Sequence, residues 1–261
     1  LRLEGHDSKF IDSFDVRFSP QDSLLGGKAV LEMLASENSR FHASISKGYK
    51  SGGFNTSGSL DEPLRLFEPE ILWNIELGWI VEFEKSDASL RALLFKMDRS
   101  DVQISTSIVR VREDGSSEFV EFTGNAAEGV NQGLELEYAQ RVNDFARIGA
   151  SLGLLNSRYN GYNSPAGEDL NGRDQAHAPS YQYSFSATFG GVSDWFGDIV
   201  IQGQDGFYFS DTHDFQSDAH ALINAGLGRY IGDFEAHFWI KNLFDQEYSV
   251  RGFFFGNDPR T

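Results

Sequence analysis

The side chains best suited to binding a small molecule lie in two segments rich in Gly, Asp and aromatic residues. One is RYNGYNSPAGEDLNGRDQAH, Arg158–His177, and the other is DGFYFSDTHD, Asp205–Asp214. Aromatic rings can stack on planar or sugar ligands, and a guanidinium can clamp an anion. The candidate ligand-binding residues are Tyr159, Tyr162, Arg173, Phe207, Tyr208, Phe209 and His213. The alternative for Phe207–Phe209 is an aromatic belt at a membrane interface.

Two further groups of polar residues have side chains that could take part in chemistry. Asp211, His213 and Asp214 carry cation-binding ligand types, but a solvated outer loop is the simpler interpretation. Glu135 and Glu137 share one face of a predicted strand, and paired carboxylates can perform acid–base catalysis. If this strand belongs to the inner wall of a barrel, pairing of the two carboxylates with Arg or Lys of neighbouring strands is the favoured interpretation. We therefore predict no metal site and no cofactor.

Several classes of function are disfavoured by composition. The chain of 261 residues has no cysteine, which excludes disulfides, thiolate metal sites and cysteine nucleophiles. It also has no Gly-x-Ser-x-Gly and no His-Glu-x-x-His motif, so we expect a protein that is not an enzyme. The formal net charge of -17 argues against a nucleic-acid partner, because phosphate binding needs clustered Lys and Arg.

The segments that must position these residues show a period of two. In PEILWNIELGWIVEF, Pro69–Phe83, every odd position from Ile71 onward is apolar, and the even positions are mostly polar. No run of 18 apolar residues exists, so no transmembrane helix is predicted. A tilted strand crosses a bilayer with roughly 9–11 residues, which this segment exceeds. We predict that its odd positions face lipid and that Glu70, Asn74, Glu76 and Glu82 face the lumen.

The same alternation recurs along the chain and predicts about ten strands. Their expected starts are Leu24, Arg40, Pro69, Ser89, Glu128, Phe145, Ser180, Phe196, Asp218 and Asp233, with an eleventh strand through Phe10–Phe18. Short polar turns alternate with long loops, which are predicted at Ser51–Leu66, Gln103–Ser117, Gly161–Pro179 and Ser210–Asp218. An up-and-down meander with tight turns on one rim and long loops on the other has this pattern.

The predicted fold class is therefore all-β, an antiparallel up-and-down transmembrane β-barrel. A soluble sandwich or propeller would have short, evenly spaced strands with a turn every 8–12 residues. Aromatic residues near the predicted strand ends are also typical of the two interfacial girdles of a membrane barrel.

Four segments, in this order and spacing, resemble the C-terminal half of a TonB-dependent outer-membrane receptor barrel. They are SISKGYKSGGFN (Ser44–Asn55), FEPEILWNIELGW (Phe67–Trp79), NAAEGVNQGLELEY (Asn125–Tyr138) and NLFDQEY (Asn242–Tyr248). The last resembles the family's next-to-last strand, with a lipid-facing row of Phe234, Ala236, Phe238 and Ile240 before a polar kink at Lys241 and Asn242. Together the segments cover most of residues 41–248.

The resemblance implies an incomplete barrel. The family barrel has about 22 strands, so residues 1–261 are expected to be a partial barrel domain, a fragment without the plug domain, the TonB box or the final strand. We expect an open curved sheet, with no ladder between Phe10–Leu34 and Phe234–Tyr248.

The function implied by the resemblance is active transport across the outer membrane of a Gram-negative bacterium. The expected partners are outer-membrane lipid, the TonB energy-coupling complex acting through the plug, and a scarce solute such as an iron chelate (siderophore uptake), cobalamin or an oligosaccharide. A passive porin-like channel is one alternative, and an outer-membrane barrel enzyme is a second.

Overall fold

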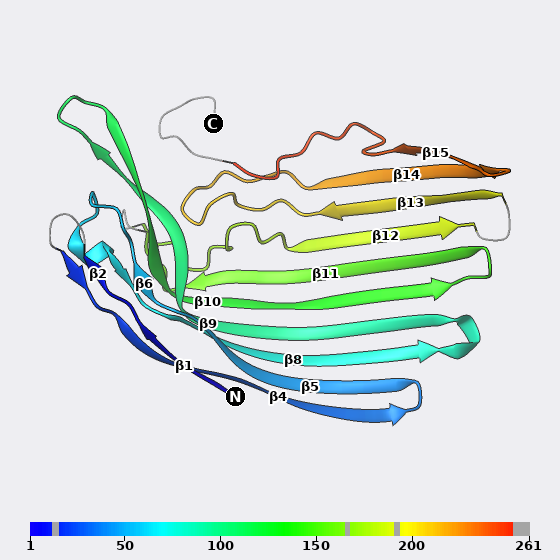
Figure 1. Ribbon diagram of the computed structural model, residues 1–261, viewed down its shortest axis with the longest axis horizontal. Coiled ribbons are helices and arrows are strands. Elements are labelled where there is room, and N and C mark those ends of the chain that lie inside the picture. Colours follow the sequence, from blue (N-terminus) through cyan, green and yellow to red (C-terminus); the bar gives the residue numbers. More distant parts are fainter. Residues whose placement is uncertain (12–15, 165–167, 191–193, 253–261) are drawn as a thin grey trace.

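The computed structural model describes residues 1–11, 16–164, 168–190 and 194–252, and its main feature is one long twisted sheet (Figure 1). Eleven antiparallel strands follow one another in chain order, apart from short strands that lie outside this sheet. The strands are β1 (Arg2–Asp7), β4 (Gln21–Ser36), β5 (Ser39–Lys50), β8 (Glu70–Phe83), β9 (Ala88–Val111), β10 (Ser117–Arg141), β11 (Ala146–Asn160), β12 (Tyr181–Phe189), β13 (Trp195–Gln204), β14 (His220–Ile231) and β15 (Phe234–Ile240). The predicted up-and-down order is confirmed.

The remaining elements are small. β2 (Phe10–Ile11) pairs with β3 (Arg17–Phe18), and β6 (Gly53–Phe54) pairs with β7 (Leu66–Phe67). Two 3-10 helices, η1 (Glu62–Leu64) and η2 (Glu84–Ser86), complete the regular structure. In the described part of the chain, no helix has the length and apolar character needed to cross a membrane.

Strand register keeps the apolar positions on one face of the sheet. Leu77 lies opposite Leu94, Leu94 opposite Leu134, and Leu134 opposite Leu154. Farther along, Phe185 lies opposite Ile201, which lies opposite Ile223. Because side chains alternate along each strand, aligned ladders of this kind place every second residue of the wall on a single apolar face.

The opposite face is polar. Glu76 accepts hydrogen bonds from Ser44 (2.8 Å) and Asn74 (2.7 Å), and its carboxylate lies 3.3 Å from Lys28 Nζ. Trp73, in contrast, shares its face with Lys47, whose Nζ lies 5.7 Å from the ring centroid. The structure therefore places Trp73 and Glu76 on different faces, as the period of two predicts.

Two rings on the polar face lie flat over glycines of the neighbouring strand. His42 is opposite Gly78, and Phe95 is opposite Gly133. A Cβ atom at Gly78 would overlap the imidazole of His42, and one at Gly133 would lie 2.1 Å from the backbone oxygen of Leu154 and 2.8 Å from Phe95 Cζ. Gly78 is needed because the His42 ring occupies the space of a side chain, and Gly133 because the Leu154 carbonyl and the Phe95 ring both do.

The connections divide between the two ends of the sheet. Short turns such as those between β4 and β5 and between β10 and β11 lie together at the right of Figure 1, and the long connections lie at the left. We call the left end the loop rim. The predicted segregation of long loops to one rim is confirmed, although only part of Gly161–Pro179 lies within the described residues.

The prediction of a loop at Gln103–Ser117 is wrong in its structure. β9 continues to Val111 and β10 already begins at Ser117, so most of this segment is a strand hairpin that projects beyond the loop rim (Figure 1). For the same reason β10 starts before the predicted Glu128. The hairpin is held because Leu60, Val120 and Phe122 form a buried cluster, and because Asn55 exchanges two hydrogen bonds with the backbone of Thr123.

The eleventh strand also differs from the prediction. It is β1, Arg2–Asp7, whereas Phe10 and Phe18 pair in the separate β2–β3 sheet, and residues 12–15 lie outside the described ranges. β1 and β15 lie at the two ends of the strand order. Among the described residues no ladder joins Phe10–Leu34 to Phe234–Tyr248, which confirms the open sheet.

The predicted kink after the lipid-facing row of β15 is present. Asn242 has a left-handed backbone with φ of 50°, and its side chain exchanges two hydrogen bonds with the backbone of Gln246. The amide of Leu243 then donates to Ile223 O at 2.8 Å, so the chain rejoins the edge of β14 with one extra residue. This arrangement is a bulge formed around Asn242.

A matched pair of substitutions on β12 tests the assignment of the two faces. Phe185 lies on the apolar face and its neighbour Ser184 on the polar face. In the full-length protein refolded into lipid vesicles, Phe185→Arg should lower the free energy of unfolding by about 2–4 kcal/mol. Ser184→Arg should cost far less, because its side chain can reach water. Equal costs in a urea titration would contradict the assignment.

Candidate functional site

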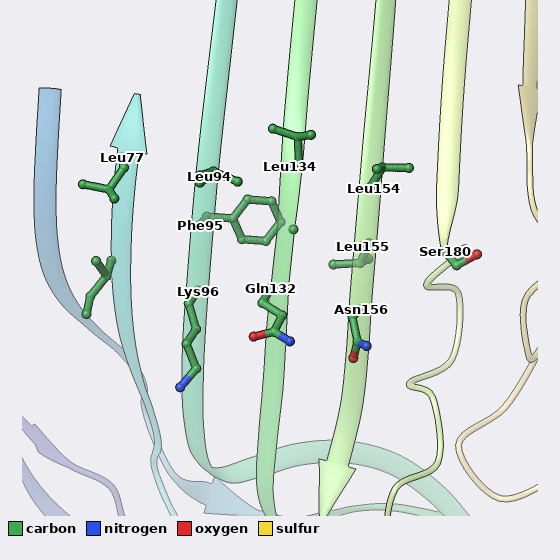
Figure 2. Close-up of a pocket in the computed structure, with 12 residues that line it drawn as sticks. Leu77, Leu94, Phe95, Lys96, Gln132, Leu134, Leu154, Leu155, Asn156 and Ser180 are labelled. Carbon is green, nitrogen blue, oxygen red and sulfur yellow. The ribbon is translucent and has the colours of Figure 1, made fainter. Parts of the chain in front are cut away.

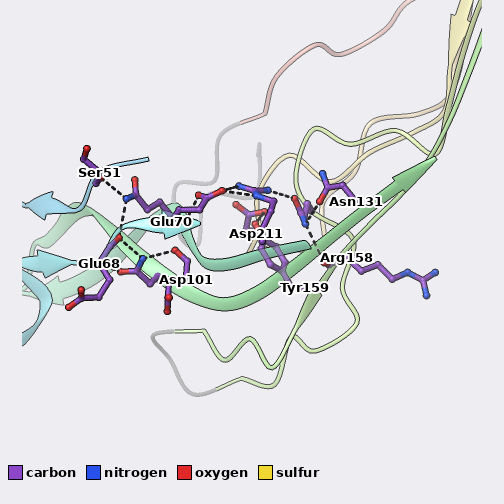
Figure 3. Close-up of polar contacts among 12 residues, drawn as sticks. Ser51, Glu68, Glu70, Asp101, Asn131, Arg158, Tyr159 and Asp211 are labelled. Carbon is purple, nitrogen blue, oxygen red and sulfur yellow. Dashed lines mark hydrogen bonds and ion pairs between the residues drawn. The ribbon is translucent and has the colours of Figure 1, made fainter. Parts of the chain in front are cut away.

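A chain of polar contacts links the long connections at the loop rim (Figure 3). It starts from Glu70 at the beginning of β8, whose Oε1 lies 2.7 Å from both Nε and Nη2 of Arg99 on β9. The Glu70 side chain is 10% exposed and that of Arg99 is 22% exposed. The second carboxylate oxygen of Glu70 accepts the backbone N–H of Gln103 at 2.9 Å. An ion pair this sheltered from water fixes the strands at the point where they leave the wall.

Amide side chains extend the chain of contacts on both sides. Gln175, from the connection between β11 and β12, accepts from Arg99 Nη1 at 2.9 Å and donates to Asn131 Oδ1 at 3.0 Å. On the other side, Gln103 donates to the carbonyl oxygens of Ser51 (2.9 Å) and Glu68 (3.1 Å). The connection between β5 and β8, the β9–β10 hairpin and the connection between β11 and β12 are thereby tied to the same pair of charges.

A tyrosine joins the fourth connection to this chain. The hydroxyl of Tyr159, at the end of β11, donates to Asp211 Oδ1 at 2.8 Å, and the backbone N–H of Ala176 donates to the same oxygen at 2.9 Å. Asp211 belongs to the connection between β13 and β14. This connection is therefore held against the one between β11 and β12.

Tyr159 and Tyr162 are buried beneath these contacts. They are 3% and 2% exposed, their ring centroids lie 5.0 Å apart, and they pack against Val102 and Ile104 of the projecting hairpin. Burial is the main factor that raises the pKa of Tyr162 to about 12, and the charge of Asp211 adds to it. The Tyr162 hydroxyl has no hydrogen-bond partner among the described residues.

Arg173 holds the same two connections together from the other side. Its guanidinium lies 4.0 Å from the ring centroid of Tyr208, its Nη1 donates to Asp214 Oδ1 at 2.6 Å, and its Nη2 donates to the carbonyl oxygen of His213. Burial lowers the pKa of His213, and the charge of Arg173 lowers it further. His213 is therefore neutral at pH 7 and presents an uncharged imidazole.

Above these contacts lies a cavity of about 590 Å³, which we call the loop cavity. Its walls come from the β9–β10 hairpin, from the connections after β11 and β13, and from the segment after β15. The lining residues are Ser105, Thr106, Ser107, Glu121, Ala176, His177, Phe209, Ser210, Asp211, Thr212, His213, Phe215, Arg251 and Gly252. Hydroxyl groups, aromatic rings and neutral imidazole dominate this lining, so it can donate and accept hydrogen bonds beside an apolar surface.

The structure separates the predicted ligand-binding residues into three groups. Phe209 and His213 line the loop cavity. Tyr159, Tyr162 and Phe207 are buried, and Arg173 with Tyr208 connects the two loops. The role of all seven residues in ligand binding stays a prediction. Within the buried group, packing explains the positions without a ligand.

Sequence reasoning misses the contribution of the hairpin to the cavity. Thr106 and Glu121 lie on strands, and His177 has a left-handed backbone with φ of 56°. The alternation in SEFVEFTG, Ser117–Gly124, is a usable signal for the strand. It cannot indicate that the strand faces loops from far along the chain.

The structure also shows the neighbours of the two other polar groups, Glu135 with Glu137 and Asp211 with His213 and Asp214. Glu137 lies 3.4 Å from Arg91 on the adjacent strand, as the predicted pairing with a basic residue requires. In the described ranges, no group of three or more His, Asp and Glu residues is arranged to hold a metal ion. Asp211 and Asp214 instead accept hydrogen bonds from Tyr159 and Arg173.

Comparison with known proteins agrees with this geometry. The family described as TonB dependent receptor-like, beta-barrel, matches residues 2–243. The ferric yersiniabactin uptake receptor FyuA from Yersinia pestis superposes with a TM-score of 0.75 at 19% identity, over 92% of this chain and 35% of that one. The siderophore receptor PiuA from Acinetobacter baumannii gives a TM-score of 0.71 at 16% identity, with the same coverage of 92% and 35%.

A receptor for a different cargo has the same fold. The copper transporter OprC superposes with a TM-score of 0.68 at 14% identity, over 97% of this chain and 41% of that one. The chain thus spans about a third of the length of the first two structures that it matches. At these identities, the likeness shows the fold and not the solute.

Tyr159 and Tyr162 allow stability to be separated from binding. Tyr159→Phe removes a hydrogen bond to a carboxylate and should lower the free energy of unfolding by about 1.5–3 kcal/mol. Tyr162→Phe removes a buried hydroxyl that has no partner among the described residues, so stability should be unchanged or higher. Chemical denaturation of the full-length protein measures both, and a larger loss for Tyr162→Phe would contradict the assignment.

The Glu70–Arg99 pair should control the order of the β11–β12 connection. Arg99→Met leaves Glu70 without its cation and Gln175 without a donor, so hydrogen exchange at residues 173–177 should accelerate. Arg91→Met provides the control, because Arg91 and Glu137 are 59% and 62% exposed and such pairs contribute about 0–1 kcal/mol. If both variants exchange at the wild-type rate, the pair does not anchor the loops.

Proposed function

The chain belongs to the TonB-dependent receptor β-barrel family, and we propose that it forms part of the wall and the binding loops of an outer-membrane receptor that imports a scarce solute. The observation that carries the proposal is the convergence of the long connections on one rim. There they enclose the loop cavity, above a wall that carries aligned apolar side chains along the middle of one face. Loops held on a rigid barrel are the usual location for ligand recognition.

The solute is proposed at the level of its chemistry. FyuA is a ferric yersiniabactin receptor and PiuA a siderophore receptor, while OprC transports copper. The loop cavity favours a solute that offers hydroxyl or amide groups and an apolar or aromatic surface, because Phe209, Thr212 and neutral His213 meet there. An iron chelate has these properties, and cobalamin or an oligosaccharide would also satisfy them. Of these, the siderophore relatives favour an iron chelate.

The proposed partners follow from the family. The wall contacts outer-membrane lipid of a Gram-negative cell, and the TonB complex supplies energy through a plug domain of the whole protein. The family and the solved structures that the chain matches are transport receptors, which supports the proposal that the protein acts as a transporter and not as an enzyme. The wall residues would supply binding and passage only.

Dependence on TonB is the decisive experiment. Uptake of a labelled ferric siderophore by cells that express the full-length protein should cease when TonB is deleted, while the receptor stays in the outer membrane. Uptake that continues without TonB would favour the passive porin-like channel. Chemical alteration of the siderophore by the purified protein would favour the enzyme alternative.

A substitution in the loop cavity tests where the solute binds. Phe209→Ala removes a ring that lines the cavity and should raise the solute concentration for half-maximal uptake about three- to tenfold, since one aromatic contact contributes about 0.5–1.5 kcal/mol. Phe119→Ala is the control, because this exposed ring on the same rim does not line the cavity. Unchanged uptake by Phe209→Ala would remove the loop cavity from the binding site.

Deletion of Gly161–Pro179 tests the contribution of the whole connection. This deletion should reduce uptake more than it reduces the amount of assembled barrel, because the wall strands retain their ladders. Heat-modifiable gel mobility measures assembly and labelled solute measures transport. Unchanged uptake would exclude this connection from solute recognition.

A further inference from the structure

A shallow groove interrupts the apolar face next to the loop rim (Figure 2). Its volume is about 560 Å³. The residues that line it are Ile75, Leu77, Leu94, Phe95, Lys96, Gln132, Gly133, Leu134, Leu154, Leu155, Asn156 and Ser180. Leu94, Leu134 and Leu154 of this lining lie on the opposite face of the sheet from Glu76, as do Lys96, Gln132 and Asn156. Phe95, Gly133 and Leu155 are aligned with Glu76 and border the groove from the other side of the strands.

The groove exists because β12 is shorter than β11. The ladder between them ends at the pair Leu154 and Tyr181, and the chain then leaves the wall through Ser180. The carbonyl oxygen of Ser180 accepts a hydrogen bond from the N–H of Leu155 at 2.9 Å, just beyond the last ladder pair of the two strands. The strands to one side continue, so an indentation is left in an otherwise even surface.

We call a row of residues that lie opposite one another on adjacent strands a level. Across the groove, the side chains change from apolar at one level to polar at the next level on the same face. The inner level is Leu94, Leu134 and Leu154, which lie opposite one another on three adjacent strands. The next level on the same face, one pair closer to the loop rim, is Lys96, Gln132 and Asn156. Figure 2 shows the leucine level above the polar level on the same three strands, with Ser180 at the end of the neighbouring strand.

We propose that this groove binds a phosphate-bearing lipid of the outer leaflet, with an acyl chain along the leucines and the phosphate against the polar level. The Lys96 ammonium and the Gln132 and Asn156 amides are all hydrogen-bond donors that suit a phosphate oxygen, whereas the Ser180 hydroxyl already donates to Asp205. Neighbouring strands are about 4.8 Å apart, so the level from Lys96 to Asn156 has the width of one headgroup.

The surrounding residues fit a boundary between hydrocarbon and headgroups at this level. Trp73 and Lys47, which stack on each other, lie one level nearer the loop rim on the same face. Amphipathic aromatic and basic side chains of this kind concentrate at membrane interfaces. Lys96 Nζ lies 3.1 Å from Asp98, but both side chains are more than half exposed, so this pair is weak and leaves the ammonium available to phosphate.

The proposal goes beyond solute import, although it shares with the proposed function the placement of the apolar face in a membrane. Native mass spectrometry of the full-length receptor in detergent, titrated with bis-phosphorylated lipid A, tests it directly. The same lipid without its phosphates is the comparison. We expect the wild-type protein to retain the phosphorylated form about tenfold more tightly, the effect of one or two charge-assisted hydrogen bonds.

Three variants distinguish this groove from general adhesion of lipid. Lys96→Gln should abolish the preference for phosphate, and Leu134→Trp, which fills the groove without removing charge, should lower retention of both lipids. Arg229→Gln is the matched control, because Arg229 stacks on Trp195 on the same face at the far rim and should leave retention unchanged.

The outcomes that overturn the proposal are equal retention of both lipids by the wild-type protein, wild-type preference in Lys96→Gln, or an equal loss in Arg229→Gln. Gel mobility before and after heating confirms that each variant is folded. TonB-dependent uptake, measured in the same variants, reports on the proposed function separately, since normal uptake is expected in Lys96→Gln whether or not lipid is retained.

Discussion

Backbone hydrogen bonding is the constraint on which this structure depends, because hydrocarbon offers no partner to an N–H or C=O group. The chain meets it with continuous antiparallel ladders from β4 to β15. Once each ladder is set, the face of every side chain is set too. A slip of one residue between β5 and β8 would turn Glu76 toward lipid and Leu77 away from it. The tight turns at one end and the aligned leucines along the wall therefore enforce the same register.

The alternation of faces changes where the wall gives way to the loops. Asp101 has a left-handed backbone with φ of 53°, and beyond it Val102 and Ile104 turn to the side on which Tyr159 packs. Asn242 has a similar backbone and begins the bulge after β15. Both are short polar residues, which adopt this conformation at lower cost than most. At each site, one residue with a left-handed backbone ends the regular alternation of the wall, and the side chains that follow it pack into loop structure.

Much of the wall could be predicted from sequence, because one face meets lipid and the other meets the lumen, so apolar and polar residues alternate along each strand. The segment from Ile71 to Val81 carries this period most clearly. Beyond Gln103 the hairpin is no longer divided between lipid and lumen, so the contrast between its two faces is smaller and the alternation in Ser117–Gly124 is easily missed. The contact of Tyr159 with Asp211 joins residues 52 positions apart. Periodicity cannot pair such residues, which explains why the buried tyrosines and the cavity-lining Phe209 look alike in the sequence.

The rings that lie over Gly78 and Gly133 have a consequence for how this wall can change over time. His42 and Phe95 each fill the space of an absent side chain on the facing strand. A larger residue at Gly78 forces the His42 ring to stand up into the passage, and one at Gly133 must displace the Leu154 carbonyl as well as the Phe95 ring. A smaller residue in place of either ring leaves a bare patch of backbone. Each position is therefore constrained by its partner across the ladder, and the two are expected to be replaced together among homologous sequences. The pairs would then appear as correlated columns that mark which strands are neighbours.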